Sequence, residues 1–258
     1  MAASVLFACG LNEQKLPPFV HISEESDIDA SFLISCILGQ RLRISNAGTL
    51  LVCLQHNYQH YFNAGMRLGY NANIFLGKTL NIIDPLNEMA RDLDESPWLE
   101  DETQVASLLL AAIRDQIACN YTNRVSTTII IDNLSILFNL GASREDVHQL
   151  CQELTSLPKE FANLTIITKM SNCDLYAVAD RNVSKLGELR IRAIKLKSGI
   201  FRDVDGKLAI DRVAMNTDGG DDAAQSAYVT EETHKEVLYK VNDRNVKIFT
   251  AGEVGVKV

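Results

Sequence analysis

Short apolar runs alternate with amphipathic segments along the first two thirds of the chain. Five of these runs predict buried strands, at 19–22, 49–54, 79–83, 127–131 and 164–168, and 74–76 competes with 79–83 for the third position. Apolar residues three and four positions apart predict helices at 31–42, 58–68 and 104–119, and another that begins at a capping box of Ser143 and Asp146. The run 127–131 is apolar on both faces, which is typical of a strand in the middle of a parallel sheet. The order predicts an α/β fold with a doubly wound, mostly parallel sheet flanked by helices.

The pattern changes in the last third of the chain, where predicted strands follow one another without helices. These strands lie at 189–197, 200–204, 207–213, 236–241 and 246–250. Asp205-Gly206 is typical of a two-residue hairpin turn, and Asn242-Asp243 predicts a second one. A parallel core that ends in antiparallel hairpins is typical of RecA-like domains. We therefore expect a single RecA-like domain over 1–258, with an N-terminal leader at 1–18 and a flexible loop at 216–226.

Composition and charge narrow the classes of function. The 258 residues are 47% hydrophobic, which is enough for the core of one large α/β domain. A net charge of -8 argues against a free-standing nucleic-acid-binding protein, because such proteins are usually basic. No apolar run is long enough to span a membrane, so we expect no membrane contact. The six cysteines form no CxxC pair and predict free, mostly buried thiols at Cys9, Cys36, Cys53, Cys119, Cys151 and Cys173.

The stretch between the first predicted strand and the first helix occupies the position of a phosphate loop. Loops of that kind read GxxxxGK[ST], and their N–H groups, lysine and hydroxyl bind phosphates and magnesium. Here Ser31 can take the hydroxyl position, but Ala30 then replaces the lysine, and no glycine is present. Four carboxylates would face the triphosphate, and like charges this close cost about 1–4 kcal/mol per pair. We predict a degenerate loop that binds no nucleotide or other cofactor, formed by Ser23, Glu24, Glu25, Asp27, Asp29, Ala30 and Ser31.

Other parts of an NTPase site are also incomplete. No Asp or Glu lies between Thr49 and Ile83, the region in which RecA-type ATPases place a carboxylate that positions water. Asp132 ends the central strand, where NTPases bind magnesium, but without the rest of the motif it is interpreted as a hydrogen-bond acceptor or a helix cap. His56 and His60 have a spacing that can bind metal on a helix. No third ligand accompanies them, so we expect a structural role and no metal site.

This acidic chain contains one basic cluster, made of Arg190, Arg192, Lys195, Lys197 and Arg202. One interpretation is an edge strand whose charges prevent further strand pairing, with a bulge near Ala193. The other is a patch that contacts RNA phosphates. A second charged stretch, 91–103, is acidic and predicts a solvated loop, although its tryptophan, Trp98, could instead anchor a partner.

Four segments, taken in order and with their spacing, resemble a known family. They read DASFLI at 29–34, HY at 60–61 with GMRLG at 65–69, DNLSILFNLG at 132–141, and GIFRDVDGKL at 199–208. Together they are similar to the sixth subunits of the Elongator complex. The resemblance implies a RecA-like domain without nucleotide motifs, in a hetero-hexameric ring with the fourth and fifth Elongator subunits. It also implies that the ring, with the remaining subunits, binds tRNA and serves the modification of its wobble uridine, in the cytoplasm or the nucleus.

Three hypotheses about function follow. The first is a non-catalytic structural subunit of such a ring, because the resemblance implies that the catalytic residues belong to another subunit. The second is an NTPase or kinase with an unorthodox phosphate loop, which would have to bind nucleotide despite the four carboxylates. The third is a ring member that completes a neighbour's active site with an arginine supplied in trans. Nucleotide binding by the isolated chain separates the second hypothesis from the others.

Overall fold

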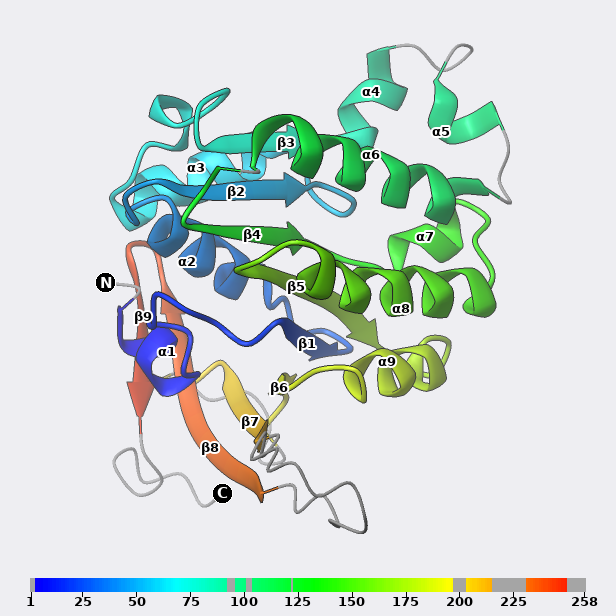
Figure 1. Cartoon of the computed structure of the whole chain (residues 1–258). Helices are drawn as coiled ribbons and strands as arrows, with labels where there is room; N and C mark the ends of the chain where they lie inside the picture. The colour runs from blue at the N-terminus through cyan, green and yellow to red at the C-terminus, as the bar shows by residue number, and fades with distance from the viewer. Residues whose placement is uncertain are drawn as a thin grey trace, which may run out of the picture.

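The computed structural model describes residues 3–91, 96–100, 104–121, 123–196, 203–214 and 231–249. A nine-stranded sheet crosses this part of the chain in the order β3-β2-β4-β5-β1-β6-β7-β8-β9 (Figure 1). Strands β3 to β6 in this order are parallel, and β6 to β9 are antiparallel. The strands are β1 Phe19–Glu25, β2 Ala47–Val52, β3 Leu80–Ile83, β4 Ser126–Ile131, β5 Leu164–Asn172, β6 Leu189–Ile194, β7 Gly206–Ala214, β8 Glu231–Asn242 and β9 Asn245–Phe249.

Helices cover both faces of the parallel part of the sheet (Figure 1). Helices α1, α2 and α3 pack on one face, and α6, α8 and α9 pack on the other. Their bounds are α1 Ala3–Ala8, α2 Ser31–Arg41, α3 Tyr58–Leu68, the 3₁₀ helix η1 Ala72–Ile74, α4 Pro85–Arg91, α5 Pro97–Glu100, α6 Val105–Asn120, α7 Ile136–Asn139, α8 Arg144–Glu160 and α9 Ala177–Ser184. The predicted doubly wound α/β fold with antiparallel strands at its end is confirmed.

The central strand β4 shows how the two cores form. Ile129 and Ile131 pack into the core beneath α6 and α8, whereas Ile130 packs into the core beneath α2 and α3. All three side chains are fully buried. Such burial stabilises the fold by roughly 25 cal/mol per Å² of apolar surface removed from water. The run at 127–131 therefore lies where its composition predicted, between β2 and β5.

Local signals determine where two of the helices begin and end. The Ser143 hydroxyl accepts the N–H of Asp146, and the Asp146 carboxylate accepts the N–H of Ser143, which completes the predicted capping box of α8. Asn57 caps α3 by accepting the N–H of His60, and Gly69 ends that helix with a φ of 84°. Because α3 begins six residues after β2 ends at Val52, its first turn lies at the carboxyl edge of the sheet.

The predicted two-residue turn at Asp205-Gly206 is wrong. Strand β6 pairs directly with β7, with Ile194 opposite Lys207, and Gly206 lies within β7 opposite Tyr239. A Cβ at Gly206 would lie 2.8 Å from Tyr239 Oη and 2.9 Å from the Ile194 carbonyl oxygen. The glycine therefore serves close packing. Of the predicted elements nearby, residues 200–202 and the loop 216–226 lie outside the described residues.

The interpretation of the basic segment as an edge strand is also wrong. Strand β6 lies between β1 and β7, and its pairing with β7 is regular from Leu189 to Ile194, so the expected bulge near Ala193 is absent from this strand. The last hairpin turns at Asp243-Arg244, one residue later than predicted, because Asn242 pairs with Asn245. The first strand continues to Glu25, so the phosphate-loop region is shorter than predicted.

Five short helices, α1, α4, α5, α7 and α9, were not predicted, and α1 lies within the segment expected to be an N-terminal leader. Helix α5 carries Trp98, whose side chain is 6% exposed and donates its indole N–H to Glu88 Oε2 at 2.6 Å. The alternative role of Trp98 as an exposed partner anchor is therefore wrong. Residues 92–95 and 101–103 of the predicted acidic loop lie outside the described part of the chain. The third strand is β3, as predicted, whereas Ala72–Ile74 forms η1.

All six cysteines are free, and Cys9, Cys36, Cys53 and Cys151 are buried, as predicted. Burial raises the pKa of the Cys151 thiol to about 12, which keeps it protonated at neutral pH. Across the described ranges, no helix has both the length and the apolar character that crossing a membrane requires.

Candidate functional site

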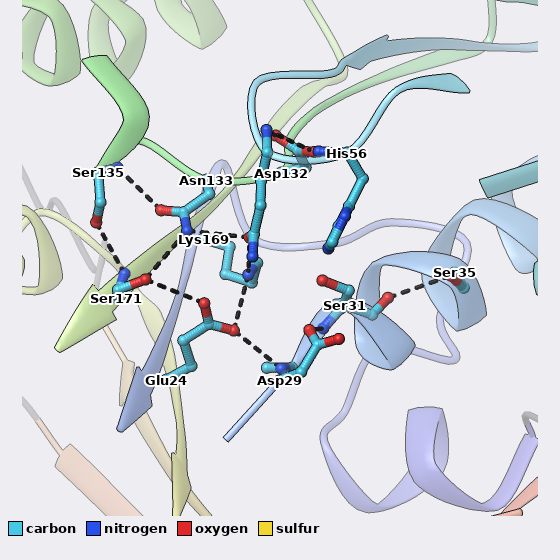
Figure 2. A network of polar contacts seen from close by, with 12 residues as sticks. Glu24, Asp29, Ser31, Ser35, His56, Asp132, Asn133, Ser135, Lys169 and Ser171 are labelled. Atoms are coloured by element: carbon cyan, nitrogen blue, oxygen red, sulfur yellow. Dashed lines mark hydrogen bonds and ion pairs between the residues drawn. The ribbon is translucent and has the colours of Figure 1, made fainter. Parts of the chain in front are cut away.

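The carboxyl ends of β1, β4 and β5 meet beside the amino end of α2 (Figure 2). In open α/β sheets, ligands bind outside the carboxyl ends of the strands, where successive helices leave on opposite faces. Helix α2 follows β1 on one face, and α9 follows β5 on the other. The polar side chains at this edge are therefore the candidate site. We call them the strand-end network: Glu24, Gln55, Asn133, Ser135, Lys169 and Ser171.

A buried ion pair lies at the centre of the strand-end network. Lys169 Nζ is 2.7 Å from Glu24 Oε2, and the two side chains are 0% and 5% exposed. The two residues come from neighbouring parallel strands, since Ser171 is the residue directly opposite Glu24. An isolated buried charge costs several kcal/mol, so each of these groups depends on the other for compensation.

Neutral groups close a ring of hydrogen bonds around the ion pair (Figure 2). Lys169 Nζ donates to Gln55 Oε1 at 2.7 Å, and the Ser171 hydroxyl donates to Glu24 Oε1 at 3.1 Å. Asn133 Nδ2 lies between them and donates to Gln55 Oε1 at 3.0 Å and to Ser171 Oγ at 3.1 Å. The network joins β1, β4 and β5 to the loop after β2, so it is built as a connected unit.

The backbone N–H groups at the start of α2 are bonded to carboxylates of the same chain. Ala30 N–H donates to Glu24 Oε2 at 2.9 Å, and Ser31 N–H donates to Asp29 Oδ1 at 2.8 Å. Phosphate-loop proteins use N–H groups in this position to bind phosphate. Here Glu24 and Asp29 occupy the position of phosphate oxygens. The residues present therefore do not fit a nucleotide.

The surroundings of Asp29 at the start of α2 stabilise its negative charge. Burial raises the pKa of this carboxyl, but hydrogen bonding from Ser31 and the positive charge of Lys169 outweigh that effect. The pKa of Asp29 therefore lies below its ordinary value, and the group is ionised at neutral pH. Its ionised form is a suitable partner for the positive end of the α2 dipole.

Asp132 acts as a hydrogen-bond acceptor at the end of β4, as predicted. It accepts the backbone N–H groups of Leu54, Gln55 and His56 at 2.7 to 3.1 Å and the Tyr61 hydroxyl at 3.0 Å. Burial raises the pKa of Asp132, and these hydrogen bonds oppose the rise. The carboxylate holds the loop after β2 against the end of β4 and has no free oxygen to offer a magnesium ion.

The other predicted loop residues have separate roles. Ser23 lies in β1 and donates its hydroxyl to Asp180 Oδ1 at 2.7 Å; Asp180 is also 3.0 Å from His21 Nε2. Glu25 accepts the backbone N–H of Lys195 at 2.8 Å, and Asp27 pairs with the Lys195 ammonium. The four carboxylates are therefore not the unpaired cluster that the sequence indicated, because Lys169 and Lys195 compensate Glu24 and Asp27.

Three members of the predicted basic cluster are described, and each has a carboxylate partner. Arg190 lies 3.4 Å from Glu232, Arg192 lies 3.3 Å from Asp211, and Lys195 pairs with Asp27. Lys197 and Arg202 lie outside the described residues. Arg190 and Arg192 thus pair across strands with β8 and β7, whereas Lys195, just after β6, pairs with Asp27 in the loop after β1.

His56 and His60 stack with ring centroids 4.0 Å apart. Three or more His, Cys, Asp or Glu side chains do not come together in a metal-binding cluster anywhere in the described ranges. The side chains of Ser31 and His56 point toward one another in Figure 2, and their Oγ and Nε2 atoms are buried without a hydrogen-bond partner. Ser31 and His60 also line a cavity of about 310 Å³ under the β8–β9 turn.

Sequence reasoning missed Lys169, which lies 145 residues from Glu24 in the chain. A signal was present, because Lys169 is the one charged residue of β5 and lies between the apolar residues Ile167 and Met170. A lysine within a strand that is buried on both faces needs an anionic partner, and such a partner is found at the carboxyl edge.

Comparison of the sequence with known proteins matches it to one family. The sequence model of the family described as Elongation complex protein 6 matches residues 4–243. A curated Drosophila melanogaster protein, Elongator complex protein 6, is 64% identical over 261 residues, with all of both chains covered.

Solved structures from the archaeon Pyrococcus horikoshii share the fold. A KaiC-like protein from strain OT3 has a TM-score of 0.58 at 11% identity, over 90% of this chain and 89% of that one. An uncharacterized protein in complex with an unknown peptide has a TM-score of 0.63 at 13% identity, over 96% of this chain and 98% of that one. At this level of identity the likeness concerns the fold alone, and it confirms the predicted RecA-like architecture.

Proposed function

Because this chain belongs to the Elongation complex protein 6 family, we propose that it is a non-catalytic structural subunit of the Elongator complex. It joins the fourth and fifth Elongator subunits in a hetero-hexameric ring of RecA-like domains. The assembled ring, together with the remaining subunits, binds tRNA and supports the modification of its wobble uridine. We propose the cytoplasm as its location, with the nucleus as an alternative.

One observation carries the non-catalytic part of the proposal. The N–H groups at the start of α2 are bonded to Glu24 and Asp29, and the Lys169 ammonium is bonded to Glu24. A triphosphate would have to displace both carboxylates and break a buried ion pair, which costs several kcal/mol. A RecA-like sheet whose own side chains fill the ligand position is suited to assembly.

The basic residues on β6 and just after it are the basis for the tRNA-binding part of the proposal. Arg190, Arg192 and Lys195 are the described candidates for phosphate contact, together with Lys197 and Arg202 beyond the described residues. Each described one would exchange a carboxylate partner for a phosphate. An acidic chain with few such groups supports a model in which the assembled ring supplies most of the tRNA surface.

The decisive experiment measures assembly and nucleotide binding separately. Native mass spectrometry after co-expression with the fourth and fifth subunits is expected to give a hetero-hexamer. Calorimetry with ATP and magnesium on the purified chain is expected to give no binding. Tight ATP binding by the chain alone would favour the NTPase or kinase hypothesis, and failure to assemble would refute the ring.

The tRNA contact is tested in the assembled ring. The double variant R190E/R192E is expected to weaken tRNA binding and to reduce the slope of log affinity against log salt by roughly 1 per lost phosphate contact. Arg114→Glu is the matched control, because Arg114 is also paired with carboxylates but lies on α6. Equal effects of the two changes would exclude a specific contact at β6.

Arginine-to-alanine changes that lower ring ATP turnover without loss of assembly would identify an arginine acting in trans.

A further inference from the structure

Arg41 is a buried cation at the other end of the sheet, where the strands begin. Its side chain is 2% exposed and makes three hydrogen bonds: Nε to Thr128 Oγ1 at 3.0 Å, and the two terminal nitrogens to the Glu13 and Gln14 carbonyl oxygens at 3.1 and 2.9 Å. All three acceptors are uncharged. A guanidinium has five N–H donors, so two of them have no partner among the residues that the structure describes.

Within the described residues no carboxylate lies within ion-pairing distance of Arg41. The other buried cation, Lys169, has Glu24 at 2.7 Å. Burial lowers the pKa of Arg41 to about 10, with no opposing carboxylate, and the group is still charged at neutral pH. A buried charge without a partner is uncommon in proteins, because its desolvation is not offset. The position therefore favours an anion from outside the chain.

Arg41 lines a cavity of about 380 Å³, which we call the Arg41 pocket. This volume falls in the range of small-molecule sites, which is about 300–1,000 Å³. Its polar lining includes Lys15 at the exposed rim and the Ser126 and Thr165 residues at the starts of β4 and β5. Its apolar lining includes Leu16, Ile44 and Val125, and Val125 is 62% exposed.

We propose that the Arg41 pocket binds the carboxylate of a small organic acid whose apolar body lies against Ile44 and Val125. The free N–H groups of Arg41 suit a planar carboxylate, which accepts two parallel hydrogen bonds from a guanidinium. Arg41 and Lys15 together carry two positive charges, so charge alone does not separate a carboxylate from a phosphate, and the apolar lining makes the distinction. The apolar wall has no role toward inorganic phosphate, and it favours an acid with a hydrocarbon body.

The test uses the full 258-residue chain and two probes of the same shape, benzoate and its neutral analogue benzamide. Calorimetry is expected to show one site per chain, with benzoate bound at least about tenfold more tightly than benzamide, as expected for a hydrogen bond to a charged group. Equal binding of the two probes, or no binding of benzoate at millimolar concentration, would overturn the proposal. Phosphate that displaced benzoate at equal concentration would overturn the carboxylate assignment.

Two matched variants locate the site without altering Arg41, whose loss would also remove its hydrogen bonds to the Glu13 and Gln14 carbonyl oxygens. Val125→Asp places a negative charge at the pocket mouth and is expected to weaken benzoate binding by about tenfold or more. Val178→Asp is the control, because Val178 is 52% exposed on α9, outside the pocket lining. Unchanged benzoate affinity in Val125→Asp, or an equal loss in both variants, would place binding elsewhere. These results are independent of ring assembly.

Discussion

The two ends of the parallel sheet each bury a positive charge, but only the one at the carboxyl ends has a carboxylate partner among the described residues. At the carboxyl ends, Lys169 is compensated by Glu24 at 2.7 Å, and the pair fills the position where RecA-like proteins bind ligands. At the amino ends, Arg41 is held by neutral oxygens beside a cavity of about 380 Å³. A filled ligand position at the carboxyl edge therefore does not exclude ligand binding at the amino edge.

Helix α2 connects the two environments. Its first residue, Ser31, lies in the filled site, and its last residue, Arg41, lies in the open one. The same helix thus presents its positive end to the carboxylates of its own chain and a positive side chain to a cavity. Substitutions at the two ends should therefore lower the free energy of unfolding by different amounts.

The largest effect is expected for Lys169→Met. This change leaves Glu24 buried without a cation and should lower the free energy of unfolding by about 3–5 kcal/mol. Urea denaturation measures the loss. Lys195→Met is the control, since its pair with Asp27 is exposed and should contribute no more than about 1 kcal/mol. Similar losses in the two variants would mean that Glu24 is not buried as described.

The double variant E24M/K169M tests whether the ion pair itself stabilises the fold. Removing both charges avoids the isolated carboxylate, so the double variant should be more stable than Lys169→Met by roughly 1–3 kcal/mol. It still loses the acceptor for the Ala30 N–H, so full recovery is not expected. A double variant no more stable than Lys169→Met would show that the surrounding network, and not the isolated charge, accounts for the loss.

A smaller loss, about 1–2 kcal/mol, is expected for Arg41→Met. Three hydrogen bonds disappear, but no charge is left alone, because Arg41 has no carboxylate partner among the described residues. The same urea experiment provides the measurement. A loss as large as that of Lys169→Met would reveal an anionic partner for Arg41 and would remove the contrast between the two ends.

The smallest effect is expected from Asp29, and it depends on pH. Its folded pKa lies below the ordinary value, so its contribution to stability is present above about pH 4 and is lost as pH falls through the folded pKa. Asp29→Asn should be less stable than the parent chain by less than about 1 kcal/mol at pH 6. The difference should shrink toward pH 3, and a difference that stays constant with pH would contradict the assignment.

Local patterns predicted the elements whose signals are strong. The β-branched run of β4, the capping box of α8 and the glycine end of α3 were found because each depends on neighbouring residues. Helices α7 and α9 were missed because they have only 4 and 8 residues, which is too few for a clear period. The turn prediction at Asp205-Gly206 was wrong because the dipeptide has the composition of a turn, whereas Gly206 is required by close packing against Tyr239.

The candidate site was only partly accessible from the sequence. The absence of glycine and lysine from the loop before α2 is local and was read directly, as was the isolated Asp132. The compensation of Glu24 by Lys169 depends on β1 and β5 lying side by side, and no local pattern specifies that pairing. The burial of Trp98 likewise depends on Glu88 of a neighbouring helix. Contacts between residues far apart in the sequence thus determine which carboxylates have a cationic partner.

The seating of α1 has a consequence for biosynthesis. The Ser4 hydroxyl donates to the Val246 carbonyl oxygen, 242 residues further along the chain, and Val5 and Leu6 share a core with Val246. During synthesis, the 242 residues that separate Ser4 from Val246 have to be added before α1 can dock against β9. Contacts of such long sequence separation slow folding and leave apolar surface open to other molecules in the meantime. The nascent chain therefore has an extended period in which chaperones, or its assembly partners, can act on it.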